Sequence, residues 1–450
     1  MRNPWMLSTI CCAATLASVA AVAGTTTPGT ASAATATPAS VTVRPSQAQQ
    51  VIDGFGFAEA FREPVITALP EAEQQELGGL LFSPRAGAGF SIVRFGLGGA
   101  TDPGDPISGP GDAAEQVWLG HLAEEFGVHQ FYADAWSAPA QFKTNGSLDN
   151  GGDLCGVPGA ATCPQGDQRR AYADYLAGQA SQFAAAGIPL QAVDFINEPE
   201  IGPDYASMQL TPAQAANFVP YLGRALAAAH LSTRVACCDN EGWGTAAQYV
   251  QAVLGDPASA RYVGLITSHG YTAAPTAALT ARRPVWESEW ANFSAWDPAW
   301  DDGTAGDGLT WADAIQAALT SGDVNGFFYW WGASASTANS GLIQVLGPTI
   351  NLSKRYWAFA AFGRYIRPGA VRISASSPDS DLAVSAFRNR DGSVAIEILN
   401  TGTAETPVQL RGLPARGATA YVTNQADSLA PVTGPLVAPA RSLLTVVIGR

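Results

Sequence analysis

Between about residues 50 and 350, short apolar runs alternate with longer stretches whose apolar residues repeat at helical spacing. Several runs are apolar almost throughout, as in Phe90–Phe95, and such runs are typical of strands buried on both faces of a parallel sheet. One helical stretch, Arg170–Gly187, places Tyr172 and Leu176 on one face. Eight units of strand and helix over about 300 residues predict an α/β fold, the (β/α)₈ TIM barrel. The predicted strands are Val51–Phe57, Phe90–Phe95, Val128–Ala135, Leu190–Ile196, Arg234–Cys238, Tyr262–Ser268, Pro284–Glu289 and Val324–Trp330.

The pattern changes near residue 367, after which no long helical stretch follows. Leu382–Phe387 and Val394–Leu399 are alternating or apolar, and the polar sequence Arg388–Ser393 between them indicates a hairpin. This region is therefore predicted to be a β-sandwich side domain attached to the barrel. Its further predicted strands are Thr406–Leu410, Ala418–Thr423 and Leu443–Ile448.

These patterns divide the chain into four parts. Residues 1–34 are expected to be a signal peptide, and residues 35–49 a linker with a strand that joins the side domain. The catalytic barrel is assigned to residues 50–367 and the β-sandwich to residues 368–450.

The first segment carries the features of a secretory signal. Arg2 is the only charged residue before the apolar stretch Met6–Val22, and Ala31-Ser32-Ala33 supplies small residues for cleavage. No later run of 18 apolar residues predicts a membrane span. We therefore expect a secreted, extracellular protein without a membrane partner.

Export would place the remaining cysteines in an oxidising compartment. Cys155 and Cys163 bracket a short loop, so we predict a disulfide between them. Cys237 and Cys238 are adjacent in an apolar, strand-like run, and we expect buried free thiols there. The histidines are scattered and neither CxxC nor HExxH occurs, so the sequence predicts no metal site.

Composition and the absence of certain motifs exclude several classes of function. Hydrophobic residues make up 47% of the chain, which provides a large core and excludes a mainly disordered protein. The formal net charge of −14 excludes nucleic acid as a partner, since a phosphate-backbone binder needs a positive surface; a neutral substrate fits better. GxSxG, GxxxxGK[ST] and a GxGxxG after a strand are all absent, and we expect no cofactor.

Two glutamates follow predicted strands where barrel active sites lie. Glu198 comes directly after strand four, and Glu289 closes strand seven. A charged residue after a buried strand is costly unless it faces the barrel mouth, so both are expected to point into the central cleft. Such a pair supports glycoside hydrolysis, in which one carboxyl group protonates the leaving oxygen and the other attacks the anomeric carbon. Asn197, beside Glu198, is placed to hold the sugar 2-hydroxyl.

Two alternatives to this interpretation stay open. Each glutamate can be a surface residue paired in a salt bridge. Glu287 also competes with Glu289 because the two share strand parity, and we favour Glu289 because it stands at the strand end. Among the many aromatic residues, we expect Trp136 and Trp330 to stack against sugar rings, because they end strands three and eight on the proposed site side.

Four motifs in order resemble glycoside hydrolase family 30, and the likeness covers essentially all of residues 40–450. They are Gly54–Phe61, Phe195–Pro199, Trp286–Trp290 and the helix Lys354–Gly369. The resemblance implies a (β/α)₈ barrel with an attached β-sandwich and a retaining mechanism. By position, it implies that Glu198 is the acid/base and Glu289 the nucleophile.

The family acts on β-xylan, β-1,6-galactan or β-glucosidic bonds. The stretch from Trp136 to Tyr172 is similar to the largely fungal xylanase subfamily, subfamily 7. The resemblance therefore implies a β-1,4-xylanase whose partner is xylan or glucuronoxylan, and we expect a monomer. The alternatives are an endo-β-1,6-galactanase and a non-catalytic carbohydrate-binding protein.

Four more residues are candidates for the substrate site. Bacterial glucuronoxylanases of the family read an acidic branch with an arginine after strand eight, whereas Gly332–Leu352 contains no Arg or Lys. Arg62, just after strand one, is the candidate for holding the branch carboxylate, and pairing with a neighbouring glutamate is its alternative role. Arg94 is expected to orient a catalytic carboxylate, and His269 and Tyr271 can serve the same end.

Overall fold

The computed structural model describes residues 38–97, 114–413 and 417–449. The predicted signal peptide, residues 1–34, lies outside the described residues. Residues 38–450 form one compact unit. Within the described ranges, no helix combines the length and the apolar character needed to cross a bilayer.

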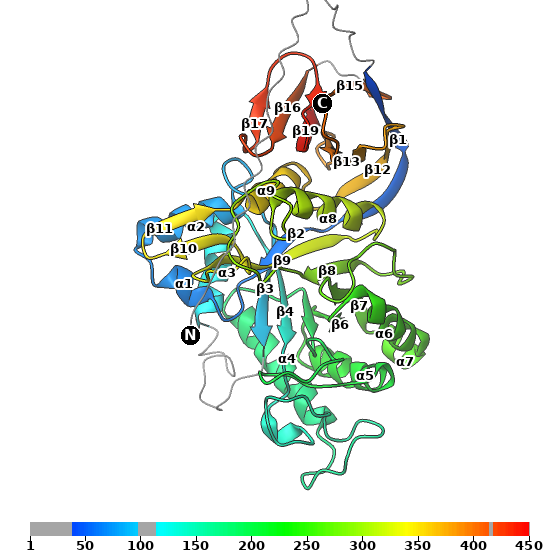
Figure 1. The fold of residues 1–450 in the computed structure, drawn as a ribbon. Helices are drawn as coiled ribbons and strands as arrows, with labels where there is room; N and C mark the ends of the chain where they lie inside the picture. Colours follow the sequence, from blue (N-terminus) through cyan, green and yellow to red (C-terminus); the bar gives the residue numbers. More distant parts are fainter. Residues whose placement is uncertain (1–37, 98–113, 414–416, 450) are drawn as a thin grey trace, which may run out of the picture. The chain divides into compact units, whose positions relative to one another are not determined.

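Eight parallel strands close into a barrel, which confirms the predicted fold (Figure 1). They follow the chain order around the barrel, and the pairing of β8 with β9 closes it. The strands are β2 (Gly54–Ala58), β3 (Ile92–Leu97), β4 (Gln130–Ala135), β5 (Ala192–Asp194), β6 (Arg234–Asn240), β7 (Val263–His269), β8 (Val285–Glu289) and β9 (Gly326–Ser334).

Helices follow the strands as the apolar pattern predicts. The helix expected at Arg170–Gly187 is α4 (Arg169–Ala185), and it buries Tyr172, Leu176 and Phe183. The others are α1 (Glu63–Thr67), α2 (Glu71–Phe82), α3 (Ala114–Glu125), α5 (Pro212–Ala228), α6 (Trp243–Gly255), α7 (Pro257–Ala260), α8 (Gly308–Thr320) and α9 (Lys354–Tyr365).

The inside of the barrel is a packed core. Seven strands, β3 to β9, each contribute one fully buried residue to a single cluster. The cluster comprises Ile92, Tyr132, Ala192, Ala236, Leu265, Trp286 and Phe328. Because this plug fills the interior, ligands can reach only the mouth at the carboxyl ends of the strands.

Two features of the barrel differ from the predicted elements. The run Val51–Phe57 is divided between two strands, because Ile52 pairs with Ala370 of the side domain and Gly54 pairs with Gly326 of the barrel. After β9, the hairpin β10 (Gly341–Leu346) and β11 (Thr349–Leu352) extends the sheet beyond the closed barrel.

The side domain is one ladder of nine strands in the order β17-β16-β19-β14-β13-β12-β1-β15-β18. Residues distant in the ladder, such as Val41 of β1 and Leu444 of β19, share one apolar core, so the ladder folds over on itself as a sandwich. The strands are β1 (Ala39–Ile52), β12 (Ala370–Ser376), β13 (Leu382–Arg388), β14 (Val394–Asn400), β15 (Thr406–Arg411), β16 (Ala418–Thr423), β17 (Ala430–Val432), β18 (Val437–Ala438) and β19 (Ser442–Ile448).

The four cysteines in the described chain form two disulfides. Cys155 and Cys163 are bonded with their Cα atoms 5.9 Å apart, as predicted. Cys237 and Cys238 are also bonded to each other, so the expectation of free thiols is wrong, although both side chains are buried. Their strand β6 shifts register against β7 between Cys237 and Asn240, and an extended strand of uniform register would point adjacent side chains to opposite faces.

Candidate active site

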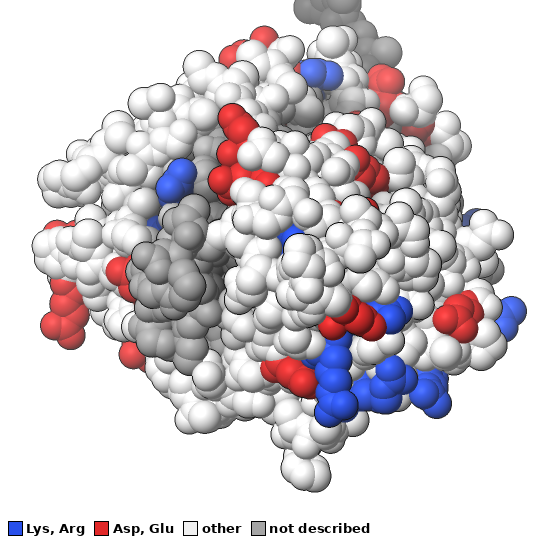
Figure 2. All heavy atoms as spheres, turned by 90° about the horizontal axis from the view of Figure 1, so that it is seen from below, with Lys and Arg blue, Asp and Glu red and all other residues white. Residues whose placement is uncertain are grey.

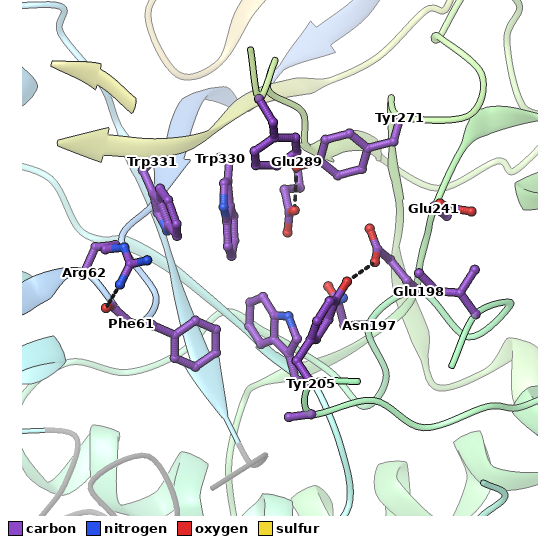
Figure 3. Close-up of a pocket in the computed structure, with 14 residues that line it drawn as sticks. Phe61, Arg62, Asn197, Glu198, Tyr205, Glu241, Tyr271, Glu289, Trp330 and Trp331 are labelled. Atoms are coloured by element: carbon purple, nitrogen blue, oxygen red, sulfur yellow. Dashed lines mark hydrogen bonds between the residues drawn. The ribbon is translucent and has the colours of Figure 1, made fainter. Parts of the chain in front are cut away.

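A cleft of about 780 Å³ opens at the carboxyl ends of the barrel strands and contains both predicted glutamates (Figure 3). Strands β3 and β4 point downward in Figure 1, and Figure 2 shows the protein from that end. Most of this face is neither acidic nor basic, and its largest group of charged side chains, basic with acidic neighbours, lies at the lower right of the view. The lining residues are Phe61, Arg62, Trp136, Asn197, Glu198, Ile201, Tyr205, Ala206, Glu241, Tyr271, Glu289, Phe293, Trp330 and Trp331.

The backbone around Glu198 is held on both sides by neighbouring strands. The N–H of Asn197 donates to the carbonyl of Ala135 at 3.1 Å, and the N–H of Glu198 donates to the carbonyl of Asp239 at 2.8 Å. Glu198 has a φ of +47°, a left-handed conformation that costs a non-glycine residue about 1 kcal/mol. The surrounding hydrogen bonds hold this conformation, which is a frequent property of functional positions.

A β-bulge sets the direction of Glu289. In the pairing of β7 with β8, Ser268 faces Glu287 and His269 faces Glu289, so Ser288 is an extra residue. The bulge breaks the shared parity on which the alternative nucleophile rested. Glu289 lines the cleft, whereas Glu287 is fully buried and accepts a hydrogen bond from the N–H of Phe328 at 3.2 Å. Glu287 is therefore not placed to touch substrate.

Carboxylate oxygens of Glu198 and Glu289 lie within 4.8 Å of each other and of a ring nitrogen of His269. Arg94 lies beneath them, fully buried, and one of its guanidinium nitrogens contacts Glu289 closely. The other guanidinium nitrogen donates to Asp134 at 2.9 Å and to Asp239 at 3.1 Å. Arg94 thus has the orienting contact that the sequence predicts.

Asn197 and Tyr271 complete the contacts around the two glutamates. The side-chain oxygen of Asn197 accepts from Arg94 at 3.0 Å, which fixes its amide plane at the cleft wall. The hydroxyl of Tyr271 donates to Glu289 Oε1 at 2.7 Å. Both residues line the cleft at their predicted places.

His269 is a charged partner of Glu198. Its Nδ1 lies 3.0 Å from Glu198 Oε1, and its Nε2 lies 3.7 Å from Asp239 and 3.8 Å from Glu289. Burial alone lowers the pKa of His269, but the charge of Glu289 and the hydrogen bond with Glu198 outweigh it and raise the pKa to about 9. The imidazole is therefore protonated at neutral pH.

Two buried groups of side chains that could ligate a metal ion lie close together. They are Glu198, His269 and Glu289, and Asp134, Asp194 and Asp239. A protonated imidazole offers no lone pair to a metal, and Arg94 already neutralises charge between Asp134 and Asp239. Burial raises the pKa of Asp134 and of Asp194 well above the usual range, which weakens both as metal ligands. The two groups are therefore better explained by ion pairs and hydrogen bonds within the protein than by a metal centre.

The predicted tryptophans form one wall of the cleft. Trp136 and Trp330 pack with ring centroids 5.7 Å apart, and the guanidinium carbon of Arg94 lies 4.8 Å from the Trp136 ring. The next residue, Trp331, also lines the cleft, which the sequence does not predict. The pairing of β2 with β9 skips from Tyr329 to Trp331, so a bulge brings adjacent side chains to the same face.

Arg62 lies at the end of this wall. Its guanidinium carbon stands 4.3 Å from the centre of the Trp331 ring, and its Nη1 donates to the carbonyl of Phe61 at 3.3 Å. The alternative partners Glu59 and Glu63 are buried, and in the described chain neither forms an ion pair with Arg62. The charge of Arg62 is free to face the cleft (Figure 3).

The sequence patterns do not single out several lining residues that follow the strands, although Glu241, directly after β6, satisfies the strand-end rule. Tyr205 donates from its hydroxyl to Glu198 Oε2 at 3.4 Å, and Glu241 follows β6. Ile201 and Phe293 lie on the loops after β5 and β8. The location rule for barrels points to these loops, but loops have no periodicity that selects single residues from them.

Two family models match the chain. The Glycosyl hydrolase family 30 TIM-barrel domain matches residues 119–283, and the Glycosyl hydrolase family 30 beta sandwich domain matches residues 369–446. Among curated proteins, glucuronoxylanase XynC of Bacillus subtilis is 23% identical, with 91% of this chain and 92% of the relative covered. Endo-1,6-beta-D-glucanase neg1 of Aspergillus fumigatus is 26% identical, with 78% of this chain and 79% of the relative covered.

Among solved structures, the catalytic domain of GH30 xylanase C from Talaromyces cellulolyticus is 38% identical, with a TM-score of 0.86. The alignment covers 91% of this chain and 100% of that domain. This relative and the matches to both family models confirm the resemblance. The chain belongs to glycoside hydrolase family 30.

Proposed function

We propose that this family 30 glycosidase is a retaining β-1,4-xylanase that cleaves xylan or glucuronoxylan. The observation that carries the mechanism is the distance between the two cleft glutamates, whose oxygens approach within 4.8 Å. Retaining enzymes hold their carboxyl groups about 5–5.5 Å apart, whereas inverting enzymes need about 6.5–9.5 Å to admit a water molecule.

In this mechanism, Glu289 is the nucleophile and Glu198 the acid/base. Glu198 gives its proton to the glycosidic oxygen while Glu289 attacks the anomeric carbon to form a glycosyl-enzyme ester. Glu198 then removes a proton from water, which hydrolyses the ester. Arg94 and Tyr271 hold the two oxygens of Glu289, so its attack direction is fixed before substrate arrives.

The assignment to xylan rests on two supports. The Talaromyces cellulolyticus relative, which is 38% identical, is a xylanase, and glucuronoxylanase XynC aligns over 91% of this chain. The cleft also suits a neutral sugar chain, since Trp136, Trp330 and Trp331 offer aromatic edges and faces for sugar C–H groups. We also propose that the protein is secreted, because residues 1–34 have the composition of a signal peptide.

Arg62 is the proposed contact for an acidic branch on the xylan chain. Its guanidinium carbon stands 4.3 Å from the centre of the Trp331 ring at the cleft, and a guanidinium is planar and can bind a carboxylate through two N–H groups. Replacing Arg62 with Gln is expected to reduce kcat/KM on branched acidic xylan while sparing linear xylooligosaccharides. An equal loss on both would assign Arg62 a local structural role.

A second candidate is hydrolysis of β-1,6-glucan. It is favoured by the similarity to endo-1,6-beta-D-glucanase neg1 at 26% identity. The deciding experiment incubates the protein with linear xylan, glucuronoxylan, β-1,6-glucan and β-1,6-galactan and sizes the products. Proton NMR of the first product is expected to show the β-anomer. Initial formation of the α-anomer would overturn the retaining mechanism, and binding to xylan without any product would overturn catalysis.

A further inference from the structure

The two ends of the cleft differ in charge. Among the described residues that line the cleft, Arg62 is the one Arg or Lys, and it stands beside Trp331 at one end. Glu241 stands at the other end, beyond Glu198, and in Figure 3 Glu289 and Glu198 lie between Arg62 and Glu241. An acidic substrate group therefore meets opposite fields at the two ends.

Glu241 is held on a rigid backbone. Its N–H donates to Glu200 Oε2 at 3.3 Å, and its carbonyl accepts from Tyr271 N at 3.2 Å and from Thr272 N at 3.3 Å. The neighbouring Asn240 donates to Glu200 Oε1 at 2.7 Å. These bonds join the loops after β5, β6 and β7, so residue 241 cannot move far from the cleft.

No cationic side chain of the described residues forms an ion pair with the carboxylate of Glu241, and His269 acts on it only through its charge. In the described chain it has no side-chain hydrogen bond and no ion pair, and it remains partly exposed at the cleft wall. Burial and then the charges of Glu198 and Glu200 raise its pKa, while the charge of His269 lowers it. The carboxylate oxygens of Glu241 are therefore available to accept hydrogen bonds, among carboxylates that outnumber the one neighbouring cation.

The proposed roles of Glu198 and Glu289 indicate which part of the substrate lies at the Glu241 end of the cleft. An acid/base must face the glycosidic oxygen, so the leaving group extends past Glu198, while the attacked sugar lies over Glu289. Glu241 stands past Glu198, on the side away from Arg62 and Trp331. The placement of Glu241 on the leaving-group side rests on the proposed function, because it uses the proposed roles of the two glutamates.

We propose that Glu241 lines the leaving-group subsite and selects an uncharged sugar residue there. Its oxygens accept hydrogen bonds from sugar hydroxyls, and its charge repels an acidic branch on the sugar that departs. An acidic branch near the cleaved bond is then accommodated on the side of Arg62. Cleavage of glucuronoxylan accordingly leaves the first sugar of the departing fragment without an acidic branch.

A transfer experiment measures the leaving-group subsite directly. The enzyme is loaded with an aryl β-xylobioside, and the ester is captured by xylobiose or by xylobiose that carries one glucuronic acid. We expect the wild type to favour the neutral acceptor by about fivefold at low salt, the size expected for one like-charge pair across a wet cleft. Glu241→Gln, which keeps the shape and removes the charge, is expected to bring the ratio close to one. In 1 M NaCl the wild-type preference is expected to shrink.

Glu76→Gln is the matched control, since Glu76 is an exposed carboxylate on α2 outside the cleft and its replacement changes the net charge equally. It is expected to keep the wild-type ratio. An unchanged preference in Glu241→Gln, or a wild type that takes both acceptors equally, would overturn the proposal. If the xyloside donor forms no ester, the xylanase assignment fails, and the same neutral and acidic acceptors with an aryl β-glucoside donor test Glu241 independently.

Discussion

Arg94 offers the sharpest test of how charge is balanced under the active site. It is fully buried and contacts Asp134, Asp239 and Glu289, all of which are buried as well. Replacing Arg94 with Met keeps a similar volume and leaves these carboxyl groups without their shared cation. Removing one partner of a buried ion pair costs about 3–5 kcal/mol of the free energy of unfolding.

That cost converts into a measurable change in Tm. The compact unit spans about 400 residues, and an unfolding entropy of about 2.1 cal/mol/K per residue gives about 0.85 kcal/mol/K in total. Arg94→Met is therefore expected to lower Tm by about 4–6 °C at pH 7. It is also expected to lose turnover, because Glu289 loses the guanidinium that orients it.

The Tm deficit of Arg94→Met is expected to decrease as the pH falls. Burial alone raises the pKa of Asp239, but Arg94 and His269 outweigh it and lower the pKa. A carboxyl group whose pKa is lowered by folding stabilises the protein above its unfolded pKa of about 3.9, and loses that effect as the pH falls through the folded value. Without Arg94, the pKa of this carboxyl rises and it takes up a proton on mild acidification. The Tm deficit of Arg94→Met is therefore expected to be full at pH 7 and smaller at pH 4.5.

Scanning calorimetry at the two pH values measures this deficit, and Arg355→Met is the control. Arg355 is equally buried but donates to the backbone carbonyls of Asp297, Gly306 and Gly341, so its removal leaves no carboxylate unpaired. Its Tm deficit is expected to be independent of pH. A deficit for Arg94→Met that is the same at pH 7 and pH 4.5 would refute the reasoning.

Four further predictions concern the catalytic pair and stability. Glu289→Gln is expected to abolish turnover on every substrate, since an amide cannot attack the anomeric carbon; near-wild-type rates would exclude Glu289 as the nucleophile. Glu198→Gln is expected to slow xylan cleavage far more than formation of the ester from activated aryl glycosides; equal losses would contradict its acid role. Since folding raises the pKa of His269 to about 9, its stabilisation is present below about pH 6.5 and lost as the pH rises through 9; the Tm gap between wild type and His269→Asn should therefore shrink above pH 9. Replacing Cys155 and Cys163 together with Ser is expected to cost about 2.5 kcal/mol in denaturant unfolding, the loop-entropy value for a closed loop of this length.

The sequence predicts the parts of this protein that follow regular periodicity. All eight barrel strands and the helix α4 come from apolar runs and spacing, and the strand-end rule selects Glu198 and Glu289. It cannot predict the bulges that turn Glu287 away from the cleft and bring Trp331 into it, because a bulge depends on pairing between distant strands.

Periodicity and the strand-end rule do not predict how the loop residues reach the cleft, for a different reason. Tyr205 and Glu241 reach the cleft through hydrogen bonds between loops that lie far apart in sequence. The bond between Cys237 and Cys238 is not predicted by an apolar, strand-like run, because neighbouring side chains of a regular strand diverge and the register shift of β6 depends on its pairing with β7.

Strand β1 has a consequence for dissecting the two domains. It enters the sandwich between β12 and β15, and Ile52, its last residue, pairs with Ala370, the first residue of β12. The two chain crossings between the domains are thus hydrogen-bonded to each other, and Trp300 of the barrel also donates to the carbonyl of Arg441. Deleting the C-terminal region would remove both neighbours of β1 and expose Val41 and Val43. The shortened barrel is therefore expected to aggregate through the unpaired edges of β1. Removing β1 together with the C-terminal region is expected to prevent this aggregation.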